Sequence, residues 1–72
     1  MDGKRTIAPG IEIIPGVSSS RPCIAGTGII ARVVCGRFRA GESASFIADD
    51  FEIQVWQVES ALRFFLNRGE DD

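Results

Sequence analysis

The sequence has no histidine and no tyrosine, and it has only two cysteines among its 72 residues. Without histidine the chain lacks the commonest general base and the commonest metal ligand in proteins. Two cysteines are too few for a cysteine-rich zinc site. A chain of this length also has too little core to enclose a deep substrate pocket. We therefore expect a protein that is not an enzyme and that uses no cofactor and no metal.

Long hydrophobic runs are also missing. No stretch approaches the roughly 18 apolar residues that a membrane-spanning helix needs. The basic start of the chain is not followed by the apolar segment of a secretion signal, because Glu12 and Pro15 interrupt the next apolar run. Cys23 and Cys35 are then expected to be reduced and structural, with a redox pair as the less favoured alternative. The chain is expected in the cytoplasm, with no membrane contact.

Charge is unevenly distributed along the chain. Residues 1–40 contain six Lys and Arg against two acidic residues, whereas residues 41–72 contain two against eight, and the formal net charge is −2. This arrangement suits a protein that presents a charged face to a polyanion or to a complementary partner, although small chains also show such asymmetry by chance. Chains this short often need self-association to be stable, so we expect oligomerisation.

The first part of the sequence predicts a short β arm over residues 7–28, after a flexible segment at residues 1–6. A β-branched run at residues 11–14 ends at a Pro-Gly turn signal, and a second extended segment at residues 22–25 ends at Gly-Thr-Gly. Two strands alone are marginal in water, so they must pack on helices or pair with another subunit. The candidate interface residues of this arm are Ile11 and Ile13.

Three helices are predicted after the arm, at about residues 29–40, 43–49 and 52–67. Ser43 is the expected N-cap of the second helix, and Gly41 suits the end of the first. Helical spacing of apolar residues assigns the core-facing side of the first two helices. These expected core residues are Ile30, Val33, Val34 and Phe38 in the first helix, and Phe46 and Ile47 in the second.

The predicted helix at residues 52–67 carries two apolar stripes. We expect the first, made of Val55, Val58, Leu62 and Phe65, to face the core. One helix of a short chain rarely buries two stripes within its own subunit, and Trp and Phe are favoured at interfaces. The second stripe is therefore a candidate surface for a second copy or a partner, with Trp56 covering the hairpin as the alternative. Its apolar members are Ile53, Trp56 and Phe64; the segment at 68–72 reads as a solvated acidic tail.

Three helices behind a β arm are typical of a helix-turn-helix domain, whose third helix normally reads DNA. Here that helix offers Arg63 as its only cation before residue 68, so other residues would have to contact phosphates. The candidates are Arg21, Thr27, Arg32, Arg37 and Arg39. Solvated surface is the alternative for the arginines in the first helix. For Thr27 the simpler interpretation is a helix N-cap, and the Gly-Thr-Gly turn is otherwise an anion-binding nest.

Two motifs carry a resemblance to a known family. Residues 20–29 read Ser-Arg-Pro-Cys-Ile-Ala-Gly-Thr-Gly-Ile, and Ala40-Gly41-Glu42-Ser43 follows the first predicted helix. Over about residues 7–66 the chain resembles the domain-of-unknown-function 433 family of small prokaryotic proteins. Compared with the family pattern, Arg21 replaces the usual Lys and keeps the charge. Gly28 replaces an Arg, which removes a fixed cation from the turn.

The resemblance implies a homeodomain-like helix-turn-helix fold and an antitoxin-like role. Members of this family are often encoded beside a PIN-like ribonuclease toxin. The implied function is a non-catalytic homodimer that neutralises such a toxin and regulates its own operon by binding operator DNA. The alternative is a stand-alone DNA-binding transcriptional regulator. A magnesium nuclease using Asp49, Asp50 and Glu52 is the least favoured hypothesis, since such acidic runs usually cap helices or lie in solvated turns.

Overall fold

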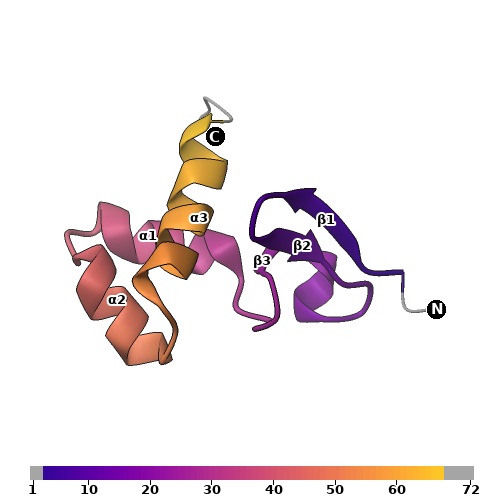
Figure 1. The fold of residues 1–72 in the computed structure, drawn as a ribbon, viewed down its shortest axis with the longest axis horizontal. Coiled ribbons are helices and arrows are strands. Elements are labelled where there is room, and N and C mark those ends of the chain that lie inside the picture. The colour runs from indigo at the N-terminus through magenta and orange to yellow at the C-terminus, as the bar shows by residue number, and fades with distance from the viewer. Residues whose placement is uncertain (1–2, 68–72) are drawn as a thin grey trace.

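The computed structural model describes residues 3–67 (Figure 1). A three-stranded sheet lies on one side of the molecule and three helices lie on the other, which confirms a mainly helical chain with an N-terminal β arm. The predicted acidic tail at 68–72 lies outside the described residues. The elements are β1 Arg5–Ala8, β2 Ile11–Ile13, a 3-10 turn at Ser18–Ser20, β3 Cys23–Ile24, α1 Ala31–Arg39, α2 Ala44–Phe51 and α3 Val55–Asn67.

The sheet is antiparallel, with β2 between β1 and β3. Arg5 pairs with Ile13 and Thr6 pairs with Glu12, so β1 begins inside the segment that was expected to be flexible. That prediction is wrong for Arg5 and Thr6, because the β1–β2 turn returns the chain alongside them. The third strand supplies the partner that two strands alone would lack.

α1 begins at Ala31, two residues later than predicted. Ile29 and Ile30 stay extended because they continue the strand pairing: the Ile24 N–H donates to the Ile29 carbonyl at 2.8 Å, and Ile30 forms a β bridge with Cys23. The β-branched side chains therefore serve the sheet before the helix starts.

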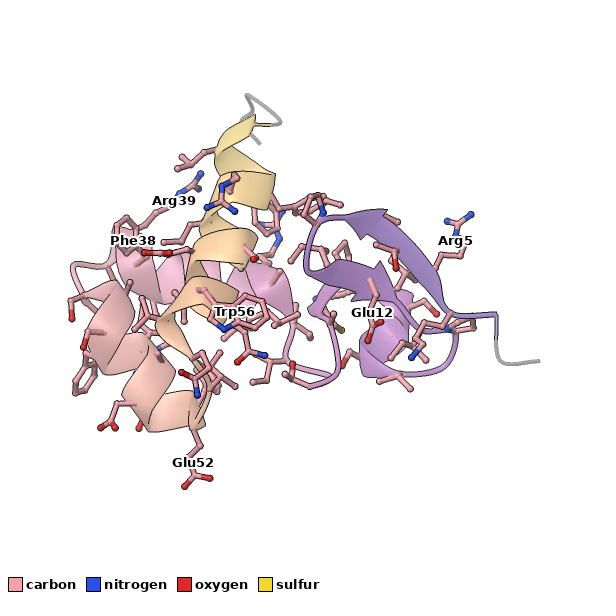
Figure 2. The ribbon with its side chains drawn as sticks, in the orientation of Figure 1. Arg5, Glu12, Phe38, Arg39, Glu52 and Trp56 are labelled. Carbon is pink, nitrogen blue, oxygen red and sulfur yellow. The ribbon has the colours of Figure 1, made fainter. Side chains whose placement is uncertain are left out.

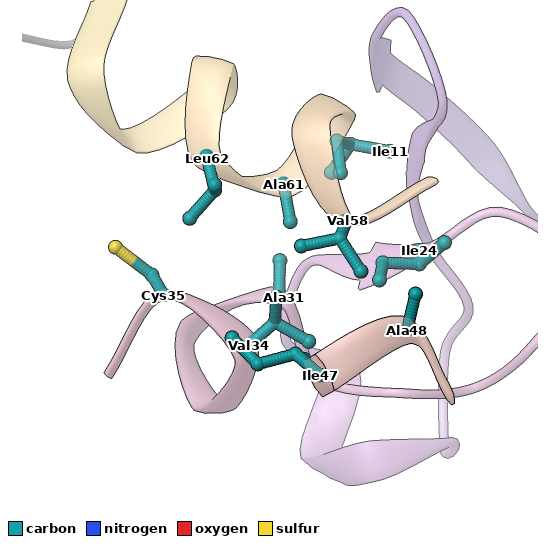
Figure 3. Packing of buried hydrophobic residues seen from close by; sticks show 10 residues of the cluster. All are labelled: Ile11, Ile24, Ala31, Val34, Cys35, Ile47, Ala48, Val58, Ala61 and Leu62. Atoms are coloured by element: carbon teal, nitrogen blue, oxygen red, sulfur yellow. The ribbon is translucent and has the colours of Figure 1, made fainter. Parts of the chain in front are cut away.

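The face that α1 turns toward the core differs from the predicted one. Ala31, Val34 and Cys35 are buried, whereas Val33 and Phe38 are 46% and 44% exposed. Of the predicted face, only Val34 is fully buried. The buried positions follow the i, i+3, i+4 spacing of a helix whose small residues, Ala31 and Cys35, face α3 (Figure 3).

α2 follows its predicted start closely. The Ser43 side chain accepts a hydrogen bond from the Phe46 N–H at 3.0 Å, which confirms the N-cap. Ile47 is buried as expected, but Phe46 is 56% exposed, so its predicted core position is wrong. The helix continues to Phe51 and ends where Glu52 adopts a left-handed conformation with φ of 61°.

The core lies where the three helices meet the inner part of the sheet (Figure 3). Ile11 and Ile24 reach into it from β2 and β3, beside Val58 of α3. Among the described residues no helix is long and apolar enough to cross a bilayer. The buried cluster consists of Ile11, Ile24, Ala31, Val34, Cys35, Ile47, Ala48, Val58, Ala61 and Leu62.

Candidate functional site

The Gly26–Gly28 turn is closed by groups of the chain itself. Glu12 Oε2 accepts a hydrogen bond from the Gly26 N–H at 2.9 Å. The Thr27 hydroxyl donates to the Ile24 carbonyl at 2.8 Å and accepts from the Ile29 N–H at 2.9 Å. Thr27 therefore caps a turn and not a helix, so its N-cap prediction is wrong. The anion at the predicted nest is the carboxylate of Glu12, which leaves Thr27 a poor candidate for phosphate.

Glu12 is the residue of this region that sequence reasoning missed. It is only 5% exposed and sits in the middle of the sheet (Figure 2), with Lys4 Nζ 4.0 Å from its other oxygen. Its signal in the sequence was an acidic residue inside an apolar run, opposite a glycine-rich turn whose N–H groups need acceptors. A buried carboxylate needs such donors, because an unpaired buried charge is strongly unfavourable.

Arg37 links α1 to α2 and is engaged in structure. Its Nε lies 2.7 Å from Glu42 and its Nη1 lies 2.8 Å from Asp50. Its guanidinium also lies 5.1 Å from the centre of the Phe51 ring. The hydrogen bond to Asp50, and then that to Glu42, raise the pKa of Arg37 above its ordinary value. Its predicted role in binding nucleic acid is therefore not supported by this geometry, since two of its donors already have partners.

Arg39, the last residue of α1, is exposed and forms no ion pair within residues 3–67 (Figure 2). It projects from the end of the helix, where a positive charge interacts favourably with the helix dipole. Arg39 remains accessible to an anionic partner, but it stands apart from the two other arginine candidates, Arg21 and Arg32.

Those two arginines meet at a groove of about 450 Å³, which we call the basic–aromatic groove. Arg32 lies with its guanidinium 5.9 Å from the centre of the Phe65 ring, and the rings of Phe64 and Phe65 meet edge to face at 5.1 Å. Both arginines are exposed, and neither forms an ion pair among the residues that the structure describes. The groove is lined by Arg21, Pro22, Ile30, Arg32, Phe64 and Phe65.

The groove thus unites residues that the sequence placed in two different sites. Arg21 and Arg32 were candidates for nucleic acid, and Phe64 was a candidate for a protein interface. Phe65 was expected in the core stripe, and it is only partly buried against the core. Helical spacing alone could not find the groove, because α3 supplies residues 64–65 of its wall, far along the chain from the segments at 21–22 and 30–32.

A second surface lies on the outer side of α3. Val55, Trp56 and Leu66 are 40%, 60% and 66% exposed, and at 3.6 residues per turn they fall within about 100° of one another. Glu59 and Arg63 are exposed between them. We call these five residues the outer face of α3; Trp56 marks it in Figure 2. Trp56 does not cover the hairpin, since most of its surface is open.

The remaining interface candidates contribute little free surface. Ile11 is 0% exposed, so its assignment to an interface is wrong: it belongs to the core. Ile13 is half-buried on β2, and Ile53 and Phe64 pack in part against the core. Ser60, in the same stripe as Trp56, is buried against Gly10 at the edge of the sheet. The second stripe is thus divided between the sheet contact and the outer face.

Within the described residues no group of three or more His, Cys, Asp or Glu side chains gathers to hold a metal ion. Asp50, one of the acids considered for magnesium, pairs with Arg37. Cys23 and Cys35 are buried free thiols on different elements. The groove and the outer face of α3 are therefore the candidate sites among residues 3–67.

The described residues thus form a small, mainly helical domain with an exposed, partly apolar outer face on α3 and a basic–aromatic groove. The family described as "Protein of unknown function (DUF433)" matches residues 11–65, which is most of the chain. The chain belongs to this family.

Among solved structures, the chain is similar to Rv2018 from Mycobacterium tuberculosis, determined by X-ray crystallography. The two share 29% sequence identity with a TM-score of 0.65, over 72% of this chain and 24% of that one. The matched part therefore spans about a quarter of Rv2018. A comparison with curated proteins gives no match.

Proposed function

We propose that this chain is a non-catalytic, antitoxin-like binding protein of the cytoplasm, which forms a homodimer and neutralises a cognate PIN-like ribonuclease toxin. The observation that carries the proposal is the outer face of α3. The core is complete without Val55, Trp56 and Leu66, yet these large apolar side chains are exposed. Exposed apolar residues gathered on one face, and a tryptophan above all, are typical of protein–protein contacts.

The family resemblance supplies the kind of partner. It implies a toxin encoded in an adjacent reading frame, and the chain's small size leaves most of its residues available for contact. A homodimer through the outer face of α3 would bury the exposed tryptophan, and the groove would remain open for the toxin.

The test measures mass and fluorescence together. We expect light scattering on a sizing column to give a dimer for the chain alone and a larger complex when it is co-expressed with the product of the adjacent reading frame. Trp56 is the only tryptophan, so burial of the outer face should shift its emission to shorter wavelength. The toxin's ribonuclease activity should fall in the complex.

A matched pair of variants separates this face from general surface change. Trp56→Ala should abolish the dimer or weaken the complex, whereas Val33→Ala, which trims a similarly exposed residue of α1, should not. A monomer of 7.8 kDa that ignores the neighbouring protein would contradict the proposal.

The second candidate is a DNA-binding regulator with a homeodomain-like helix-turn-helix fold. Its support is the three-residue turn from 52 to 54 between α2 and α3, a length typical of helix-turn-helix motifs. The outer face of α3 argues against it, because Glu59 and apolar side chains occupy positions that a DNA-reading helix fills with polar and basic residues.

Salt dependence distinguishes this candidate. If the domain binds its own promoter, its affinity for that DNA should fall steeply as the salt concentration rises. The triple variant Arg21→Ala, Arg32→Ala, Arg39→Ala should then reduce the slope of log affinity against log salt concentration by roughly 0.9 for each phosphate that is no longer neutralised. Arg37→Ala should change stability and leave that slope alone, because its guanidinium is paired with carboxylates. A salt-independent affinity, or no shift at micromolar protein, would contradict DNA binding.

A further inference from the structure

We propose that the basic–aromatic groove binds a short extended segment of a partner protein in which a carboxylate lies next to an apolar side chain. This rests on the proposed function, since it assigns a recognition site to a chain that binds a protein partner. It goes further by naming where that partner's segment binds and which side chains it must present.

The charge of the groove selects an anion. Arg21 lies just before β3 and Arg32 lies in the first turn of α1, and no acidic residue is among the six that line the groove. Neither guanidinium is neutralised by a carboxylate of residues 3–67. Arginine pairs with a carboxylate through two parallel hydrogen bonds, which fixes the orientation of the bound group as well as adding affinity.

The aromatic wall selects an apolar neighbour for that carboxylate. Four of the six lining residues are apolar, and Phe64 and Phe65 present ring edges and faces in a T-shaped pair. The position of Arg32 over Phe65 restrains the guanidinium beside the rings before any ligand arrives. A ligand with its carboxylate and its apolar side chain on adjacent residues contacts the arginines and the aromatic wall at the same time.

The volume of the groove limits the ligand to a short segment. About 450 Å³ lies within the range of roughly 300–1,000 Å³ that holds a small molecule or a few side chains. A whole helix of a partner does not fit such a space. An extended chain of three or four residues does.

Two cations are too few for a nucleic-acid site. Binding to DNA draws much of its affinity from phosphates neutralised by Lys and Arg, about six to ten of them in a strongly salt-dependent site. Among residues 3–67 the other exposed arginines lie on β1, at the far end of α1 and on the outer face of α3, so they do not extend the groove. An apolar lining with two convergent arginines matches a peptide carboxylate better than a phosphate backbone.

The first experiment titrates isotope-labelled protein, observed by amide NMR, with three probes. They are the N-terminally acetylated and C-terminally amidated peptide Leu-Asp-Phe-Glu, its neutral counterpart Leu-Asn-Phe-Gln, and an oligothymidylate of eight nucleotides. We expect the acidic peptide to shift amides around the groove and to bind about tenfold more tightly than the neutral one. The double variant Arg21→Gln, Arg32→Gln should lose that preference, whereas the control Arg5→Gln, Arg39→Gln should keep it.

Three results would overturn the assignment. They are equal affinity for the acidic and neutral peptides, no shift at the groove with millimolar acidic peptide, and stronger binding of the oligothymidylate there. The last result would indicate that the groove binds nucleic acid and not a peptide.

The second experiment separates the groove from the proposed function. With the product of the adjacent reading frame, the groove variant should weaken the complex about tenfold relative to the control variant. If the wild-type chain forms the complex and the groove variant binds equally well, the groove assignment fails and the proposed function stands. If the wild-type chain forms no complex, the proposed function fails, and the peptide titration decides the groove by itself.

Discussion

Gly10 sets how closely the sheet approaches α3. It has a positive φ of 77°, and a Cβ at this position would lie 2.8 Å from Ser60 Oγ and 3.0 Å from Ser60 Cβ. The Ser60 hydroxyl donates to the Trp56 carbonyl at 3.0 Å. A glycine is needed here both for its backbone conformation and for its lack of a side chain.

We predict that Gly10→Ala destabilises the chain by roughly 2–4 kcal/mol, because it adds a steric contact to the strain of a positive φ. Gly16→Ala is the matched control: its φ is 83°, but nothing lies within 4 Å of its Cβ position. It should cost only the strain, about 1 kcal/mol. Urea unfolding followed by circular dichroism measures both. Equal losses would show that Ser60 yields to the new methyl group.

Arg37 was predicted to bind nucleic acid, and in the structure it instead pairs with Glu42 and Asp50. We predict that Arg37→Ala lowers the melting temperature by a few degrees, because Glu42 and Asp50 lose their common partner and the Phe51 ring loses the cation beside it. Arg39→Ala, two residues along the same helix, should leave it nearly unchanged. High salt should narrow the difference between the two variants, as for any partly exposed ion pair.

The raised pKa of Arg37 fixes the sign of its pH dependence. A cation whose pKa rises on folding stabilises the folded chain fully at every pH below its ordinary, unfolded-state pKa. This stabilisation is lost only as the pH rises through the raised, folded-state pKa. For arginine that limit lies far above neutral pH, so the stabilisation should be constant across the neutral range. A melting-temperature difference that changed on moving from pH 6 to pH 9 would contradict this.

At the scale of elements, the sheet and the turn before α1 are joined by Glu12. We predict that Glu12→Ala destabilises the chain by about 1–3 kcal/mol, because the Gly26 N–H loses its acceptor in a part-buried place. Glu12→Gln keeps an oxygen acceptor and should cost less. Hydrogen exchange at the Gly26 amide is the direct readout. Unchanged exchange in Glu12→Ala would show that water replaces the carboxylate without cost.

Several element ends were readable from the sequence because local chemistry sets them. Ser43 caps α2, and α3 runs to Asn67 as its missing Gly and Pro predicted. The starts of α1 and α3 were each predicted too early, by two and three residues. The two errors have different causes. Ile29 and Ile30 pair with β3, and Glu52 turns left-handed, so longer-range pairing and the preceding turn overrule helical periodicity.

For the whole molecule, α3 has one side that stabilises the fold and one side that is available for binding. We predict that Val58→Ala, at a fully buried position, costs about 2 kcal/mol or more. Trp56→Ala should cost less than about 0.5 kcal/mol in the isolated monomer, although it removes a larger side chain. Denaturation at several protein concentrations measures both. A loss in Trp56→Ala that grows with protein concentration is expected from the proposed dimer, whereas a large loss that persists at the lowest concentration would contradict this prediction.

The overall architecture, a β arm followed by three helices, could be predicted from composition and local pattern. A short chain without histidine, with strand-forming residues first and amphipathic segments later, predicts a small domain with a β arm and three helices, because these signals act between near neighbours in sequence. The candidate binding surfaces could be predicted from the sequence only in part. Arg21, Arg32 and Phe64 could be named as binding residues, yet nothing local shows that they share a groove. Ile11 is buried, Arg37 is paired and Glu12 holds a turn because packing brings distant segments together, and only the tertiary structure decides which side chains remain exposed.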